Sequence, residues 1–493
     1  MQTQYWQRIL IGLGLAMALA VPCPSAPTNY YVVTSSQQPS PPASLWTNWG
    51  LAHTNLFEVV AVARDGDTVY VTNNAKYYLT NQIVVAYAFT LRSWGPGGIQ
   101  DPSNTIIDAN IPGAATTNRH FTLSNYWATL AGFTLTNGSD RSYTTNAASG
   151  GSICLQYGIV TNCIIMRNYA LNPHSDYSRA GGGGICMGVN SAQYPDIGSG
   201  GVWNCTISGN SAYKNGGGIL IYSKGPWRIA NCTISGNSAS GAQNAGGGIY
   251  ANSSAAGTII SNCWVVSNYS LQYAGGMFLG YSAQCHNSFI MGNTAAAHQG
   301  GGVRMNTSTM LRNCLIANNI ANGTGNAWGG GISASGANPS IQNCTVVSNY
   351  CKQDGGGIDF SNYDGFPKVE NTIIWGNSAS ANSGVKSNYY IDRSNATYAV
   401  VTFTNCCTSP NIVSTNGVAT EVNTITNDPR FVQAVTGNYR LQSGSPCINA
   451  GTNEPWMIGA QDLDGYRRID QFSGQVDIGA YEYLPSGTLF VVH

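Results

Sequence analysis

The stretch that decides the fold is Asn231-Cys232-Thr233-Ile234-Ser235-Gly236-Asn237, which is followed by Gly246-Gly247-Gly248-Ile249. The same two elements, Asn-x5-Asn and a glycine run that ends in an apolar residue, alternate along the chain every 25 to 34 residues or so. Copies of the first element begin at Asn162, Asn204, Asn231, Asn262, Asn287, Asn313, Asn343 and Asn371. Repetition of this length predicts a solenoid, in which each coil buries its apolar face by stacking on its neighbours.

Two positions of the Asn-x5-Asn element show which side chains point inward. The position after the first asparagine is always small, and it holds Cys163, Cys205, Cys232, Cys263, Ser288, Cys314, Cys344 and Thr372. The third position is always β-branched and aliphatic, and it holds Ile165, Ile207, Ile234, Val265, Ile290, Ile316, Val346 and Ile374. Because side chains alternate along a strand, both positions lie on one face, which we predict to be the buried face of a parallel β-strand. The period of two and the glycine triplets argue against helices.

The asparagines and glycines that frame these strands are predicted to form the corners of the coils. Stacked asparagine amides can hydrogen-bond from coil to coil, and asparagine tolerates a left-handed backbone. The glycines allow positive φ and a close approach of neighbouring backbones. Because they recur from coil to coil, they do not indicate a phosphate-binding loop. We expect the inward cysteines to form a ladder of free thiols rather than disulfides or a zinc site. The pairing of Cys285, Cys351 and Cys447 stays open.

Charged residues are scarce, since Asp, Glu, Lys and Arg make up only 9% of the 493 residues, and 21 basic residues balance 21 acidic ones. This neutrality argues against a nucleic-acid or anionic-membrane partner. The N-terminus has one cation, Arg8, followed by an apolar run over residues 9–21, which is typical of a signal peptide and too short to span a membrane. We expect cleavage after Ala20, an extracellular or cell-surface location, and no membrane span.

The repeats resemble those of bacterial right-handed parallel β-helix proteins with the pectate-lyase-like fold. Near the C-terminus, Asp428-Pro429-Arg430-Phe431 and Asp477-Ile478-Gly479-Ala480-Tyr481-Glu482 resemble the choice-of-anchor Q domain. We therefore expect an all-β, single-stranded right-handed parallel β-helix of about ten to twelve coils over residues 29–441. A C-terminal closing segment, residues 442–493 with a match that begins near residue 428, follows it. Residues 47–64 are predicted to form an N-terminal cap helix.

Carboxylates are absent from the middle of the chain, because residues 197–353 contain no Asp or Glu. The central coils therefore cannot carry out glycoside hydrolysis with two carboxylates. Beyond them, Asp359 is predicted to point outward in the same column as Arg304, two coils or roughly 10 Å away. We assign Arg304, Asp354 and Asp359 as the candidate site of a polysaccharide lyase, and Asp354, Asp359 and Asp364 as candidate calcium ligands. The alternative is a solvated loop with a loose ion pair. No other cofactor is expected.

Two weaker candidates lie elsewhere in the chain. The stretch from His174 to Arg179 belongs to a long insertion between coils, and long loops often carry function. Asp462-x-Asp464-Gly465 resembles half of a calcium-binding loop but lacks the later glutamate, so that an Asx turn is the expected structure.

The outward positions of the Asn-x5-Asn strands contain an apolar row formed by Trp264, Phe289 and Leu315, with Met291 beside it, where flanking coils carry Thr and Ser. An apolar patch of this kind either binds a glycan or a protein, or is covered by another segment of the chain. We assign these four residues as candidate ligand-binding residues and add Tyr250 from the other outward column.

Three functions are consistent with this pattern. The first is a secreted or surface protein, adhesin-like, that binds a polysaccharide or a surface protein through the sides of the solenoid. The second is a polysaccharide-active enzyme, either a lyase or a glycoside hydrolase, and the third is a structural surface protein. The missing carboxylates favour binding over catalysis.

Overall fold

The computed structural model describes residues 26–34, 46–95, 101–110, 118–140, 150–171, 181–188, 200–223, 225–241, 246–251, 257–361, 365–380, 387–392, 400–409 and 418–485. The predicted signal peptide, the insertion from His174 to Arg179, and Asp364 lie outside these residues.

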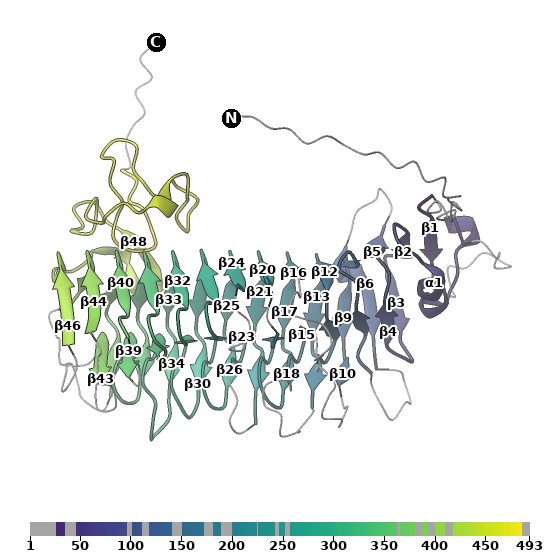
Figure 1. The fold of residues 1–493 in the computed structure, drawn as a ribbon, viewed down its shortest axis with the longest axis horizontal. Helices are drawn as coiled ribbons and strands as arrows, with labels where there is room; N and C mark the ends of the chain where they lie inside the picture. Colours follow the sequence, from purple (N-terminus) through teal and green to yellow (C-terminus); the bar gives the residue numbers. More distant parts are fainter. Residues whose placement is uncertain are drawn as a thin grey trace, which may run out of the picture.

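The chain forms a right-handed parallel β-helix with four parallel sheets along its sides (Figure 1). One coil passes in turn through sheets A, B, D and C, as in β20 (Arg228–Ala230), β21 (Thr233–Ser235), β22 (Ser238–Ala239) and β23 (Ile249–Ala251). Over the described residues, sheets B and C contain 12 and 11 strands, which agree with the expected number of coils.

Sheet A contains β1 (Asn29–Val32), β2 (Thr68–Thr72), β5 (Thr90–Trp94), β8 (Thr129–Ala131), β12 (Gly158–Thr161), β16 (Gly200–Trp203), β20, β24 (Ile259–Ser261), β28 (Gln284–His286), β32 (Met310–Arg312), β36 (Ser340–Gln342), β40 (Lys368–Glu370), β44 (Val400–Thr404) and β46 (Val418–Val422). Sheet B contains β3 (Ala75–Tyr78), β6 (Thr105–Asp108), β9 (Thr134–Thr136), β13 (Ile164–Met166), β17 (Thr206–Ser208), β21, β25 (Trp264–Val266), β29 (Phe289–Met291), β33 (Leu315–Ala317), β37 (Thr345–Val347), β41 (Ile373–Trp375) and β45 (Cys407–Thr408).

Sheet C contains β4 (Ile83–Val85), β7 (Phe121–Leu123), β11 (Ile153–Leu155), β15 (Ile185–Met187), β19 (Ile219–Ile221), β23, β27 (Met277–Leu279), β31 (Val303–Met305), β35 (Ile332–Ala334), β39 (Ile358–Ser361) and β43 (Tyr389–Asp392). Sheet D contains β10 (Ser139–Asp140), β14 (Tyr169–Ala170), β18 (Ser211–Ala212), β22, β26 (Tyr269–Ser270), β30 (Thr294–Ala295), β34 (Ile320–Ala321), β38 (Tyr350–Cys351) and β42 (Ser378–Ala379).

The two inward positions predicted from the repeat are buried in every coil, and both columns belong to one continuous core except for the small polar residues among them. The 13 cysteines in the described part of the chain are buried free thiols, including Cys285, Cys351 and Cys447. Each ladder thiol lies near backbone carbonyls, as at Cys232, whose Sγ is 3.2 Å from the carbonyl oxygen of Ala230. The prediction of a thiol ladder is therefore confirmed for these residues.

The two asparagine columns have different structural roles. The first asparagine of each element has a φ between 47° and 55°, which is the left-handed conformation expected at a corner. The second asparagine is buried, and its side-chain oxygen accepts hydrogen bonds from the equivalent asparagine of the preceding coil. Asn268 Oδ1, for example, accepts from both the backbone N–H and the side-chain amide of Asn237, each at 3.0 Å. Equivalent bonds run from Asn168 to Asn377, so that a buried amide ladder joins the coils.

The glycine triplets make room for this ladder. A Cβ atom added to Gly248 would lie 3.0 Å from the Asn268 side chain and 2.7 Å from the carbonyl oxygen of Gly276. The same contact recurs between the equivalent glycine and asparagine of the other coils. The two repeated elements are therefore coupled, because the glycine leaves the space that the asparagine amide fills.

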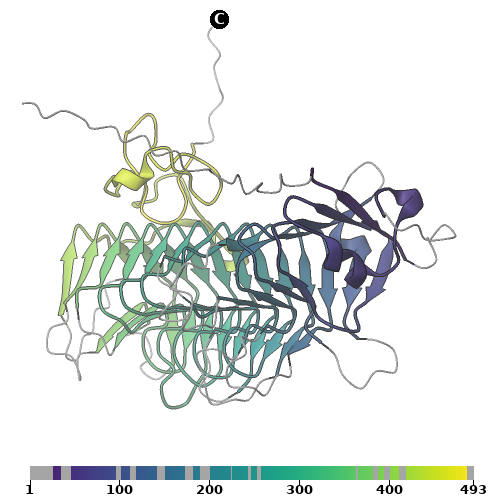
Figure 2. The ribbon, with the colours of Figure 1, turned by 45° about the vertical axis from the view of Figure 1, so that its right-hand side comes forward.

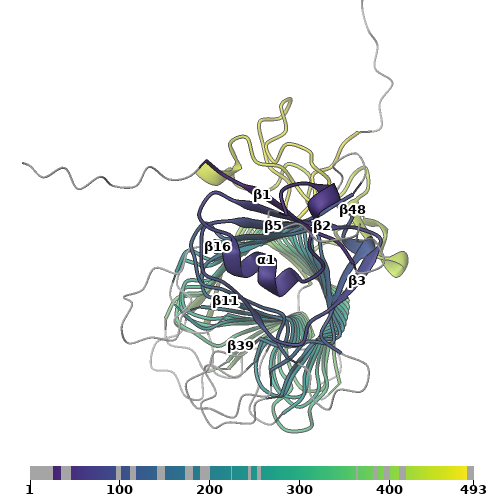
Figure 3. The same ribbon diagram turned by 90° about the vertical axis from the view of Figure 1, so that its right-hand side faces the viewer.

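The N-terminal cap is shorter than predicted. Within the expected range of residues 47–64, the chain forms the 3₁₀ turn η2 (Trp49–Leu51) and the helix α1 (Leu56–Val62), whose N-cap is Asn55. The helix buries Leu56, Val59 and Val60 against the first strands and lies across the end of the solenoid (Figure 3). Among the described residues, no helix is long and apolar enough to cross a membrane.

In the structure, the residues that follow β46, the last strand of sheet A, form the C-terminal segment. It contains an antiparallel hairpin, β47 (Phe431–Gln433) and β48 (Asn438–Leu441), and the short 3₁₀ turns η5 (Ala434–Thr436) and η6 (Pro455–Met457). A further 3₁₀ turn, η4 (Pro102–Asn104), lies near the other end of the molecule. The segment packs along the side of the last coils (Figure 2), where Tyr439, Ala480 and Tyr481 cover part of the outer face of sheet B.

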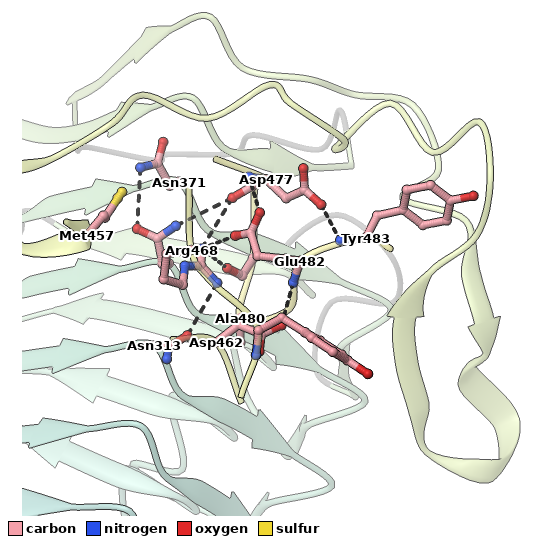
Figure 4. A network of polar contacts seen from close by, with 12 residues as sticks. Asn313, Asn371, Met457, Asp462, Arg468, Asp477, Ala480, Glu482 and Tyr483 are labelled. Atoms are coloured by element: carbon pink, nitrogen blue, oxygen red, sulfur yellow. Dashed lines mark hydrogen bonds and ion pairs between the residues drawn. The ribbon is translucent and has the colours of Figure 1, made fainter. Parts of the chain in front are cut away.

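A buried polar network fastens this segment to the solenoid (Figure 4). Arg468 is fully buried; its guanidinium contacts Glu482 at 3.1 Å, the carbonyl oxygen of Gly479 at 2.9 Å, and Asn313 Oδ1 in the solenoid at 3.4 Å. The side chain of Asp477 accepts hydrogen bonds from backbone N–H groups of the segment itself. Burial raises the pKa of Glu482 to about 9. The charge of Arg468 opposes this shift, whereas the charges of the buried carboxyls of Asp477 and Asp462 add to it.

Candidate functional site

The C-terminal segment covers part of the apolar row on the outer face of sheet B. Leu315 and Ala317 are buried beneath it, in a cluster with Tyr439 and Tyr481, and Phe289 and Met291 lie at the edge of this cluster. Leu315 is therefore not available to a ligand, because its side chain packs inside the protein. The hypothesis that another segment of the chain covers the apolar row is therefore confirmed for Leu315.

Trp264 lies beyond the segment and remains 47% exposed. Its ring stacks on Phe289 with centroids 4.0 Å apart and planes 15° apart. The two residues are register partners on β25 and β29, so that the stack runs along the axis of the solenoid. Phe289 thus packs against one face of the indole and fixes its orientation on the sheet.

The neighbouring coils on the other side of Trp264 present only small side chains. Thr233 is the register partner of Trp264, and Thr206 is the partner of Thr233. With Ser235 and Ser208 they form a half-buried strip of hydroxyl groups on β21 and β17. A threonine side chain is too short to cover an indole ring, so the second face of Trp264 is left open on the side of this strip.

A second group of candidates lies on the outer face of sheet C. Tyr250 on β23 stacks on Phe278 on β27, with centroids 4.8 Å apart and planes 19° apart. Arg304 on β31 follows Phe278 in register, and its guanidinium lies 4.3 Å from the ring centroid of Tyr273 and 5.9 Å from that of Phe278. Tyr273 stacks in turn on His298 at 4.5 Å. Tyr250 is therefore on a different side of the solenoid from Trp264.

The predicted alignment of Arg304 with Asp359 is confirmed, since β31, β35 and β39 place Arg304, Ser333 and Asp359 in one register column. Asp359 is buried and its Oδ2 accepts a hydrogen bond from Ser333 Oγ at 3.3 Å. Arg304 Nε donates to Ser335 Oγ at 3.2 Å. Burial lowers the pKa of Arg304, while the charges of Tyr273 and Asp359 act in the opposite direction. The column is thus a row of polar residues on sheet C in which Ser333 and Asp359 are buried, and not a loose ion pair on a solvated loop.

Among the described residues, no group of three or more His, Cys, Asp or Glu side chains is placed to hold a metal ion. Asp354 and Asp359 are both buried, and the third calcium candidate, Asp364, is not among the described residues. At the other predicted half-loop, Asp462 Oδ1 accepts hydrogen bonds from the backbone N–H groups of Asp464 and Tyr466. This is the Asx turn expected there.

Sequence reasoning missed a pocket of about 410 Å³ at the N-terminal end of sheet B. It lies between the start of α1 and β3, and the rings of Phe57 and Tyr78 line it. The alternation in Ala75-Lys76-Tyr77-Tyr78 could have shown that Tyr78 points outward, but Phe57 reaches the same place only through the cap helix.

Comparisons with known proteins identify the fold. No family model matches the sequence, and no curated protein matches it. Among solved structures, the complex of XylC with xylose matches with a TM-score of 0.51 and 10% identity, covering 93% of this chain and 98% of that one. Pectate lyase Pel9A matches with a TM-score of 0.42 and 13% identity over 93% and 97% of the two chains. A PL6 alginate lyase in complex with a trisaccharide matches at 0.43 and 14% identity over 84% and 91%. The likeness shows that this chain shares the parallel β-helix fold.

Proposed function

We propose that the protein binds carbohydrate through the outer face of sheet B, with Trp264 as the main contact. The observation that carries this proposal is the exposed indole, which stacks on Phe289 and stays uncovered where the C-terminal segment ends. Xylose is the ligand named for XylC, a solved structure that matches this chain with a TM-score of 0.51, and this supports a carbohydrate ligand here.

The chemistry of the face suits a sugar ring. A pyranose has an apolar face of C–H groups that packs on an aromatic ring, and a rim of hydroxyls that needs hydrogen-bonding partners. Trp264 offers the ring, and Thr233, Thr206, Ser235 and Ser208 offer hydroxyls beside it. The face carries no titrating group at these positions, so we expect binding that depends little on pH.

Retention on immobilised polysaccharides tests the proposal. A panel of xylan, mixed-linkage glucan, galactomannan and polygalacturonate should include at least one polymer that retains the protein. Trp264→Ala should weaken that binding roughly tenfold, because it removes a stacking partner. Tyr281→Ala, which removes a ring of similar exposure (45%) away from this face, is the matched control and should bind like the wild type. Retention of the Trp264→Ala variant at wild-type strength would contradict the proposal.

A second candidate function is a polysaccharide lyase that uses Arg304. The position of Arg304 on the outer face of sheet C, against the ring of Tyr273, favours it. The base that removes a proton from a sugar carbon has to be the neutral guanidine, and burial lowers the pKa of Arg304 in that direction. Elimination leaves an unsaturated product that absorbs ultraviolet light, so a panel of uronate polymers with and without calcium tests the idea. A rise in absorbance that disappears in Arg304→Ala would establish the lyase. Polymer retention without turnover favours binding alone, and inertness in both assays favours a structural role.

We further propose that the chain is exported through its N-terminal signal peptide and acts outside the cell as an adhesin-like protein. The apolar run over residues 9–21 supports export. The likeness of the C-terminal segment to the choice-of-anchor Q domain supports a surface protein. Fractionation of expressing cells, with comparison of the mature N-terminus to Val21, tests both points. A full-length chain confined to the cytoplasm would contradict them.

A further inference from the structure

We propose that the outer face of sheet B holds one neutral polysaccharide chain at two separate anchors, Trp264 and the pocket lined by Phe57 and Tyr78. This inference rests on the proposed carbohydrate-binding function and extends it, because it specifies a long, uncharged polymer and a second binding site.

The pocket has the composition of a sugar subsite. Phe57 and Tyr78 are 51% and 46% exposed, so both offer apolar surface to a ligand in the pocket. Residues with hydroxyl or amide side chains also line the pocket, namely Thr34, Thr54, Thr80, Asn81 and Asn55, whose amide oxygen caps α1. At about 410 Å³ the pocket is large enough for a sugar unit, and it combines stacking surfaces with neutral hydrogen-bonding groups.

The charges at the pocket favour a neutral ligand. Lys76 also lines it, but its ammonium lies 2.7 Å from Asp108 Oδ2. Asp108 is nearly inaccessible, and its other oxygen accepts hydrogen bonds from Asn110 N–H and Asn137 Nδ2. The hydrogen bond from Lys76 to Asp108 raises the lysine pKa, so that the pair stays ionised and mutually neutralised. An anionic sugar would therefore gain little from Lys76.

The path between the anchors carries few charges: the Asp108 carboxylate on β6, which pairs with Lys76, and the exposed Arg167 at the corner after β13. The outward residues of β13, β17, β21 and β25 are Ile164, Met166, Thr206, Ser208, Thr233, Ser235, Trp264 and Val266. A polyanion would find no cation among these eight side chains. A neutral polymer can pack on the apolar ones and hydrogen-bond to the hydroxyls.

Both anchors lie on one continuous sheet. From β3, which carries Tyr78, to β25, which carries Trp264, the sheet makes six strand-to-strand steps (Figure 1), or roughly 29 Å at about 4.8 Å per step. Near β9 the turn η4 lies on the face, where Thr134 Oγ1 donates to the carbonyl oxygen of Pro102, so the polymer crosses the outside of this turn. A disaccharide cannot reach both anchors, whereas a polymer can.

Two linked anchors predict a dependence on chain length, because the second contact becomes intramolecular once the first is made. The probe is the neutral polymer of the panel above that is retained most strongly, and its disaccharide. By titration calorimetry the wild type should bind the polymer at least tenfold more tightly than the disaccharide. Tyr78→Ala should remove most of this advantage while leaving disaccharide binding at Trp264 in place, and Phe57→Ala should do the same.

The outcomes separate this inference from the proposed function. If Trp264→Ala weakens polymer binding but Tyr78→Ala and Phe57→Ala behave like the control Tyr281→Ala, carbohydrate binding stands and the second anchor is refuted. Equal affinity of the wild type for polymer and disaccharide also refutes it, as does stronger retention on polygalacturonate than on every neutral polymer. If no polymer retains the wild type, the proposed function itself fails.

Discussion

Replacing Asn268 with alanine is expected to destabilise the middle of the solenoid strongly. The side chain is buried and makes four hydrogen bonds: its Oδ1 accepts two from Asn237, and its Nδ2 donates to the carbonyl oxygen of Ile234 at 2.9 Å and to Asn293 Oδ1 at 3.0 Å. A hydrogen bond of this kind contributes about 0.5–1.5 kcal/mol net, so their loss lowers the local free energy of unfolding by about 2–6 kcal/mol. The upper part of the range applies if the Asn237 N–H finds no new partner in its buried position.

The matched control is Asn262→Gly, which changes the other asparagine column of the same coil. Asn262 has a φ of 53° and makes one exposed side-chain hydrogen bond, to Asn231 Oδ1 at 3.2 Å. Glycine adopts the same backbone conformation without a side-chain clash, so we expect a change below about 1 kcal/mol.

Amide hydrogen exchange is the suitable assay, because a long solenoid need not unfold in a single step. The amides of β21, β25 and β29 report the local free energy of opening. In Asn268→Ala they should exchange faster by the factor that corresponds to 2–6 kcal/mol, and in Asn262→Gly they should exchange like the wild type. Unchanged protection in Asn268→Ala, or equal losses in both variants, would refute the idea that the buried amide ladder holds the coils together.

Three further predictions concern other parts of the fold. Gly248→Ala should destabilise its coil by about 1–3 kcal/mol in thermal unfolding, since the new methyl group would press on the Asn268 amide, whereas Gly325→Ala, with nothing within 4 Å, should stay within about 0.5 kcal/mol. The folded chain holds the Glu482 proton more tightly than the unfolded chain, so this group contributes stability that is full below about pH 4.5 and is lost as the pH rises towards 9. Calorimetry across this range should show that fall for the wild type and a flatter curve for Glu482→Gln. Burial raises the pKa of Cys406 to about 12, and all 13 described thiols are buried, so a maleimide should label none of them before unfolding; rapid native labelling would contradict the ladder.

The repeated parts of the fold could be predicted because each coil makes the same local choices. The small and β-branched columns fix the inward face, and Asn-x5-Asn fixes the corners, so one repeat such as residues 231–249 predicts the packing of all the others. The same register rule predicts from the sequence alone that Arg304 lies in line with Asp359, and the pairing of β31, β35 and β39 confirms it. Periodic patterns reduce a long-range question to a local one.

The non-repeated parts could not be predicted in the same way, since their positions depend on contacts between segments that lie far apart in the sequence. Arg468 contacts Asn313, and Tyr439 contacts Ser348, across 155 and 91 positions. No periodicity relates these residues, so the sequence could suggest that a segment covers the apolar row but not which residues it covers. The pocket at Phe57 could not be predicted either, because its position depends on how α1 packs against β3.

The extent of this cover also decides how the exposed ring should be interpreted. An apolar row on a sheet face needs no function when another segment buries it, and this explains Leu315, Ala317 and Val347. The explanation ends at Phe289, which lies at the edge of the cluster, and it does not reach Trp264. Leaving an indole half-exposed on a strand gains little for folding, because much of its apolar surface still contacts water. Trp264, the part of the row that no segment covers, thus adjoins the strip of hydroxyl groups on β21 and β17. This is why we place carbohydrate binding there.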